Sequence, residues 1–254
     1  DADLVIGAAG ASAAYVFFGP LTGPTLTTGA ADVTILGATS GDEFGAAVHT
    51  GDINDDQIRD LIVGAPRNGA GGEGAVYAFF GGSGFAPANT AAADLEVLGQ
   101  TGEAIGRALA VGELNSDSRT DLAFGATTVD RVYVFFGSNS ITGGTSANAD
   151  ATFTGAATGD GFGASITIGD TDGDLIGDLI VGAPQDDGAG TDAGAVLVFR
   201  GGASFSGIGA ASANTIVLGE TAGDAFGSAV AVGDFDGDGN DELLGGAPLW
   251  DVDG

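Results

Sequence analysis

A block of 26 residues that recurs four times constrains this chain more than any other feature. The copies begin at Gly41, Gly102, Gly159 and Gly223 and align without a gap. In every copy the same spacing joins an early Phe or Ile, the first acid of an acidic loop and a later Gly. All variation in length lies between the blocks. The chain is therefore expected to repeat one rigid structural unit, with connecting loops that differ between copies.

Each unit has the residue pattern of β-strands. A short strand of small residues is predicted at 46–50, and the apolar runs at 61–63 and 179–181 are typical of buried strands. A third strand is predicted at 75–80, and a fourth, more polar one at 94–99. Four strands in each repeat of about 60 residues is the organisation of a β-propeller blade.

We therefore predict an all-β fold, a β-propeller of four-stranded antiparallel blades, as one domain or fragment over residues 1–254. The predicted divisions are a partial blade at 1–40, blades at 41–100, 101–157 and 158–221, and a partial blade at 222–254. Three arrangements are compatible with this strand content. The chain could be a fragment of a larger propeller, a closed ring of four blades, or an open-ended chain whose unpaired edges associate with neighbouring molecules.

The acidic loops are the predicted sites of chemistry. Each is nine residues long, with oxygen-bearing side chains at positions 1, 3, 5 and 9 and a carbonyl available at position 7. A hard cation such as Ca²⁺ takes six to eight oxygen ligands. We predict about one Ca²⁺ in each loop, up to four. The predicted ligands are Asp52, Asn54, Asp56, the Ile58 carbonyl and Asp60 in the first loop; Glu113, Asn115, Asp117, the Arg119 carbonyl and Asp121 in the second; Asp170, Asp172, Asp174, the Ile176 carbonyl and Asp178 in the third; and Asp234, Asp236, Asp238, the Asn240 carbonyl and Glu242 in the fourth.

The loops differ from EF-hand loops, which begin with the same spacing. An EF-hand requires a Glu at position 12 and flanking helices. Position 12 here is occupied by Val63, Phe124, Val181 and Gly245, inside a predicted strand. The alternative is that the acids are solvated turn residues, since Asp and Asn favour turns. Mutual repulsion between the carboxylates favours a bound cation instead.

The four loops are expected to differ in calcium affinity and in backbone strain. The second loop is predicted to bind most weakly, because its first ligand is the longer Glu113 and it has only three acids. Position 6 calls for a left-handed backbone, which Gly adopts most easily. Gly occupies it only at Gly239, so the loops with Gln57, Ser118 and Leu175 are expected to be strained.

Charge and composition exclude several classes of function. The chain has 35 acidic residues against 6 Arg and no Lys, for a net charge of −29. Nucleic acids and anionic membranes are poor partners for such a surface. The absence of Cys excludes disulfides and Cys-ligated zinc, and the single His49 excludes a His-cluster metal site. Since no apolar run is long enough, no transmembrane segment is predicted.

The block resembles a known repeat. Phe44-Gly45, the acidic loop and Gly64-Ala65-Pro66 are similar to the FG-GAP repeat of integrin α-subunit propellers and their bacterial relatives. The resemblance extends over nearly the whole chain. It implies a β-propeller, calcium in the hairpin loops of individual blades, and an extracellular or cell-surface location. Integrin propellers have seven blades, more than this chain contains.

The expected function is that of a non-catalytic, extracellular calcium-binding module with no catalytic residues. It would serve adhesion, recognition or structural assembly in a filament or surface layer, with calcium making the blade hairpins rigid. Its partner would be a protein or glycan surface ligand, with self-assembly through open blade edges as a further option. The alternative is an accessory or catalytic propeller domain of a carbohydrate- or lipid-active enzyme, because FG-GAP-like propellers occur in such proteins.

Overall fold

The computed structural model describes residues 2–22 and 25–249, and within them the chain is all-β, with only single 3₁₀ turns besides. No helix among these residues has the length and apolar character needed to cross a membrane. The strands are β1 (Leu4–Ala8), β2 (Ala13–Phe17), β3 (Val33–Leu36), β4 (Val48–Gly51), β5 (Asp60–Ala65), β6 (Ala75–Phe79), β7 (Leu95–Leu98), β8 (Leu109–Gly112), β9 (Asp121–Ala126), β10 (Arg131–Phe135), β11 (Gly144–Thr145), β12 (Ala151–Thr154), β13 (Ser165–Gly169), β14 (Asp178–Ala183), β15 (Ala195–Phe199), β16 (Thr215–Leu218), β17 (Ala229–Gly233) and β18 (Glu242–Gly246).

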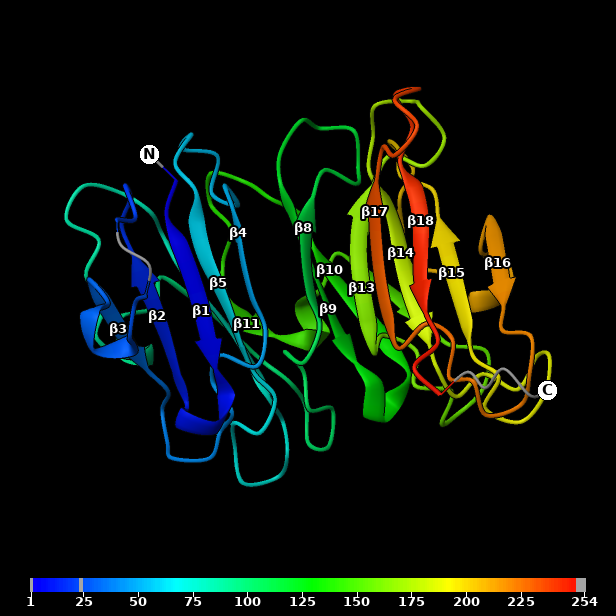
Figure 1. The fold of residues 1–254 in the computed structure, drawn as a ribbon, viewed down its shortest axis with the longest axis horizontal. Coiled ribbons are helices and arrows are strands. Elements are labelled where there is room, and N and C mark those ends of the chain that lie inside the picture. Colours follow the sequence, from blue (N-terminus) through cyan, green and yellow to red (C-terminus); the bar gives the residue numbers. More distant parts are fainter. Residues whose placement is uncertain (1, 23–24, 250–254) are drawn as a thin grey trace.

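The strands form five sheets that stand side by side in a row, as in a β-propeller (Figure 1). The first sheet is β1-β2-β3, the second β4-β5-β6-β7, the third β8-β9-β10-β12, the fourth β13-β14-β15-β16 and the fifth β17-β18. Consecutive strands within each sheet pair antiparallel. The prediction of four-stranded antiparallel propeller blades is confirmed.

The acidic loops connect the first two strands of a sheet. Gly51 pairs with Asp60 at the end of the β4–β5 hairpin, and Gly112 pairs with Asp121 in β8–β9. The same pairing recurs at the ends of β13–β14 and β17–β18. Because the hairpins have one register, all four loops emerge at equivalent positions of their sheets.

The core consists of apolar layers between neighbouring sheets. Successive side chains of a strand point to opposite faces. Ile62 of β5 packs toward the third sheet, whereas Leu61 and Val63 pack toward the first. These three side chains and the equivalent apolar run of β14 are at most 4 % exposed, as the sequence predicts. Burying each such side chain contributes about 1.5–3 kcal/mol to folding.

Short parallel contacts connect neighbouring sheets at their outer edges. The two-residue strand β11 leaves the third sheet and pairs with β7 of the second. Leu36 pairs in the same way with Asn89, and Thr154 with Gly209. The sequence did not predict these contacts, which repeat along the row.

Within residues 2–22 and 25–249, the row of sheets is open at both ends. The first and fifth sheets lie at opposite ends of it, and β17 pairs with β18 and packs on β13 (Figure 1). The closed ring of four blades is therefore wrong. Leu4 and Ile6 of β1 are 38 % and 41 % exposed, although their counterparts Leu61 and Val63 are almost fully buried. The first sheet thus exposes an apolar face, whereas the equivalent face of the second sheet is buried against its neighbour.

Candidate metal centres

Every acidic loop is curled by hydrogen bonds from its own main chain. The position-5 carboxylate accepts the N–H of position 7 in all four loops, which makes the same Asx turn each time. The pairs are Asp56 with Ile58 at 2.8 Å, Asp117 with Arg119 at 2.9 Å, Asp174 with Ile176 at 2.9 Å and Asp238 with Asn240 at 2.8 Å. This repeated turn makes the four loops structural equivalents.

The position-1 carboxylate lies across the loop. Asp170 Oδ1 accepts the N–H of Gly173 at 2.7 Å, and its Oδ2 accepts the N–H of Leu175 at 2.8 Å. Asp52 accepts the N–H groups of Asp56 and Gln57 in the first loop. The main chain therefore wraps around the first carboxylate and brings the later side chains toward it.

The position-9 acid anchors the loop to its sheet. Asp60 Oδ2 accepts the N–H of Ile53 at 2.9 Å, and its Oδ1 accepts the N–H of Gly81, beyond β6, at 3.0 Å. Asp121 and Asp178 make the corresponding pairs of hydrogen bonds, and all three carboxylates are buried. Asp3 accepts the N–H of Gly19 in the same way. These acids have a structural role in addition to any role as ligands.

Burial raises the pKa of two of these anchoring acids. The pKa of Asp121 rises to about 7, because desolvation outweighs the opposing hydrogen bonds from Gly137 and Leu114. Desolvation also raises the pKa of Asp60. A nearby cation would favour the ionised form of either carboxylate.

The third and fourth loops bring their acids together. Ligand atoms of Asp170, Asp172 and Asp174 lie within 4.8 Å of one another. So do those of Asp234, Asp236 and Glu242. Three carboxylates at this separation, partly open to water, fit the oxygen-rich and hydrated coordination of a hard cation. Asp178 and Asp238 lie outside these two groups.

The first and second loops have Asn54 and Asn115 in place of an acid at position 3. Among residues 2–22 and 25–249, the groups in the third and fourth loops are the ones that gather three acids within that limit. Asn54 stands at position 3 of the first loop, and its Nδ2 donates to Asp56 Oδ2 at 3.1 Å. The count of converging acids therefore does not separate the first loop from the second, and the weaker binding expected of the second loop remains a prediction.

Position 6 has the predicted left-handed backbone. Gln57, Ser118 and Leu175 have φ values of 69°, 67° and 69°, like Gly239 at 95°. A non-Gly residue in this conformation costs about 1–2 kcal/mol. Leu175 is also 88 % exposed, so no packing offsets its strain.

Sequence reasoning missed a second acid that recurs in every block. In each block the carboxylate of this acid accepts the main-chain N–H of the residue three positions earlier, and all four acids are buried. Glu103 also accepts the hydroxyl groups of Tyr133 and Ser146. The signal was present as a Gly-acid pair just before each Phe or Ile. The four residues are Asp42, Glu103, Asp160 and Asp224.

A cavity lies between the first and second sheets. Its volume is about 710 Å³, with apolar walls that include Val16 and Phe18 and polar groups from Asp3 and Arg59. At the next two interfaces Ile53 and Leu114, both at loop position 2, pack into the core. The cavity therefore corresponds to a packing position, and Phe18 is 43 % exposed beside it.

The comparisons with known proteins agree with the repeat. The FG-GAP repeat family profile matches residues 44–79, 162–199 and 226–254. None of these segments includes the second block.

Mammalian enzymes are among the similar proteins. Phosphatidylinositol-glycan-specific phospholipase D of Bos taurus is 33 % identical over 70 % of this chain, and that of Homo sapiens is 33 % identical over 82 %. The rat enzyme is 32 % identical over 61 %. The chain spans 23 %, 26 % and 20 % of these proteins, about a quarter of their length. Together with the propeller sheets and the recurring loops, the matched segments show that this chain contains FG-GAP repeats.

Proposed function

We propose that this chain is a non-catalytic, calcium-stabilised propeller segment that accompanies an extracellular lipid-active enzyme. The similarity to phosphatidylinositol-glycan-specific phospholipase D supports this role over adhesion alone. This reverses the order of the two functions expected from the sequence, because it favours the alternative. The converging carboxylates of the third and fourth loops support calcium as the ion.

The chemistry of the described residues supports the non-catalytic part. Along 2–22 and 25–249 most acids of the loops accept main-chain hydrogen bonds, and the cavity between the first and second sheets corresponds to a packing position. His49 lines a different, open cavity beside Asp52 and Arg59, without Ser or Cys among its lining residues. A rigid segment that positions a separate catalytic domain would need no nucleophile.

The test is an assay with vesicles that carry a phosphatidylinositol-glycan-anchored protein. The purified chain is added with calcium or with chelator, and the anchored protein released into the supernatant is measured. We expect no release above buffer in either condition, together with calcium binding by the chain. Calcium-dependent release would show that the segment is itself catalytic and would refute the proposal.

The exposed end faces favour a second function, head-to-tail assembly with a second copy of this chain. Leu4 and Ile6 occupy positions that face the preceding sheet elsewhere, and Leu244 occupies one that faces the following sheet. Phe235, at loop position 2, is 67 % exposed, whereas Ile53 and Leu114 are fully buried. The two end faces are thus the two halves of the interface that recurs inside the chain.

Sedimentation velocity across a range of concentrations tests this assembly. Ile6→Glu and Leu244→Glu should each block one face, so neither variant alone extends beyond a monomer. Their mixture should form dimers, because each retains the other face. Leu175→Glu is the control, since Leu175 is exposed in a loop away from both faces. A wild type that stays monomeric, or variants that assemble like the wild type, would refute this second function.

A further inference from the structure

The second acidic loop differs from the others at position 7. The other loops have Ile58, Ile176 and Asn240 there, whereas the second has Arg119, a cation. The block that contains it is also the one outside the matched FG-GAP segments. Two independent comparisons, within the chain and with the family, therefore single out the same loop.

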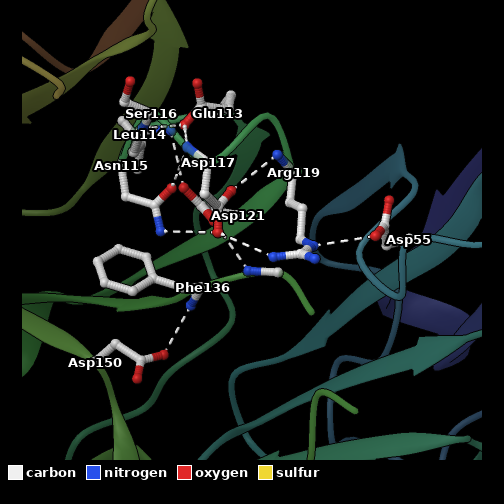
Figure 2. Close-up of polar contacts among 11 residues, drawn as sticks. Asp55, Glu113, Leu114, Asn115, Ser116, Asp117, Arg119, Asp121, Phe136 and Asp150 are labelled. Carbon is white, nitrogen blue, oxygen red and sulfur yellow. Dashed lines mark hydrogen bonds and ion pairs between the residues drawn. The ribbon is translucent and has the colours of Figure 1, made fainter. Parts of the chain in front are cut away.

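The Arg119 side chain bridges two loops. Its Nε lies 3.1 Å from Asp55 Oδ2 of the first loop, and its Nη1 lies 3.6 Å from Asp117 Oδ2 of its own loop (Figure 2). Asp55 is 64 residues away in the sequence. The guanidinium thus carries its positive charge to the position-5 carboxylate, one of the predicted calcium ligands.

The acids of this loop already have donors. Asp117 Oδ1 accepts the Arg119 N–H at 2.9 Å, and its Oδ2 accepts Asn115 Nδ2 at 3.3 Å besides the guanidinium (Figure 2). Glu113 Oε1 accepts the N–H of Ser116 at 2.5 Å. Asp121 is buried and bonded to the main chain through both oxygens. What the first loop lacks is the guanidinium at position 7, which places one positive charge beside the Asp117 carboxylate.

The third loop shows that a neighbouring arginine alone is not enough. Arg200 Nε lies 3.0 Å from Asp172 Oδ2, yet Asp170, Asp172 and Asp174 still converge. Arg200 follows β15 and pairs with one of four acids. Arg119 lies inside a loop with three acids, next to the carboxylate that closes the turn.

We propose that the Arg119 guanidinium takes the place of calcium in the second loop and joins that loop to the first without metal. This inference rests on the proposed calcium binding of the other loops. The chain would then bind three calcium ions instead of four. Arg119 would act as a residue that determines which loops bind metal, and its ion pair with Asp55 would persist when the ions are removed.

Equilibrium dialysis with radioactive calcium, in about 0.15 M salt to screen diffuse binding, gives the count. We expect three ions for the wild type. Asp117→Asn should leave the count at three, whereas the matched change Asp174→Asn in the third loop should lower it to two. Far-ultraviolet circular dichroism verifies that both variants are folded. A fall in the count for Asp117→Asn would overturn the inference.

A gain-of-binding variant provides the converse test. Glu113→Asp combined with Arg119→Ile gives the second loop the position-1 and position-7 residues of the first, and should raise the count to four. Arg67→Ile is the control, because Arg67 pairs with Glu43 away from the loops. Four ions in the wild type, or three in the double variant, would refute the role of Arg119 but not the proposed function. No bound calcium in the wild type would refute the proposed function itself.

Discussion

The Asp121 carboxylate accepts a hydrogen bond of 2.9 Å from the main-chain N–H of Gly137, sixteen residues further along the chain. This bond connects the acidic loop between β8 and β9 to the end of β10. Asp60 and Gly81 form the same contact in the second sheet, and Asp178 and Gly201 in the fourth. The loops are therefore part of the blade framework. A change in the conformation of a loop is transmitted to the strands through the acid at position 9.

Removing one anchoring charge should destabilise a blade. Asp178→Asn keeps the shape of the side chain, but its amide nitrogen cannot accept one of the two N–H groups from Thr171 and Gly201. We expect the free energy of unfolding to fall by about 1.5–3 kcal/mol, as for loss of a hydrogen bond to a charged group that leaves a partly buried N–H unpaired. Urea denaturation with chelator present measures the change. Glu220→Gln, at an exposed site, is the control. Equal stability of the two variants would contradict the anchoring role.

The raised pKa of Asp121 predicts a pH dependence of the calcium-free protein. Because its folded-state pKa of about 7 exceeds the ordinary value of 3.8, the folded state binds the proton more tightly than the unfolded state. Stability should therefore decrease as the pH rises from about 4 to 7. Asp121→Asn cannot titrate and should show a smaller decrease in urea denaturation at several pH values. An unchanged slope in this variant would contradict the assignment to Asp121.

Relief of backbone strain should stabilise the third loop. Leu175→Gly removes the left-handed strain of about 1–2 kcal/mol, and the greater freedom of Gly in the unfolded chain offsets part of the gain. We expect a net increase of about 0.5–1 kcal/mol in the free energy of unfolding, measured with urea. Leu175→Val should lower stability, since a β-branched residue fits this conformation poorly. The reverse order of the two variants would contradict the strain.

Much of this fold could be predicted because its signals are local. The fixed spacing within the blocks gave the acidic loops and the apolar runs gave the buried strands, and both depend on neighbours in the sequence. The left-handed position 6 followed in the same way from the requirements of one turn, and Gln57 and Ser118 confirm it.

The missed features depend on contacts between sheets. Strand β11 has only two residues, and its pairing with β7 exists only once the sheets are side by side. The bridge from Arg119 to Asp55 joins residues 64 positions apart through a long, flexible side chain. The buried acid at Glu103 was visible in the repeat, but its partner Ser146 comes from the loop before β12. Spacing alone cannot predict such partners.

Single ligand changes should rank the loops. Asp236→Ala removes one of three converging carboxylates of the fourth loop and should abolish most of the calcium-dependent stabilisation from that site. At a hundredfold excess over Kd this is about 2.7 kcal/mol. Asn115→Ala, at the same position of the second loop, should have a smaller effect. The difference in melting temperature between calcium and chelator measures both, and a larger effect at Asn115 would contradict the ranking.

The most direct test of calcium as a structural ion is a thermal melt of the whole chain followed by circular dichroism. Samples contain millimolar calcium, millimolar magnesium or excess chelator at one ionic strength. Calcium should raise the melting temperature by several degrees, because it binds the folded loops and offsets the repulsion among their carboxylates. Magnesium should raise it less, since it prefers a tighter octahedral site. Superimposable melts in calcium and in chelator would show that the loops are solvated turns and would contradict the account.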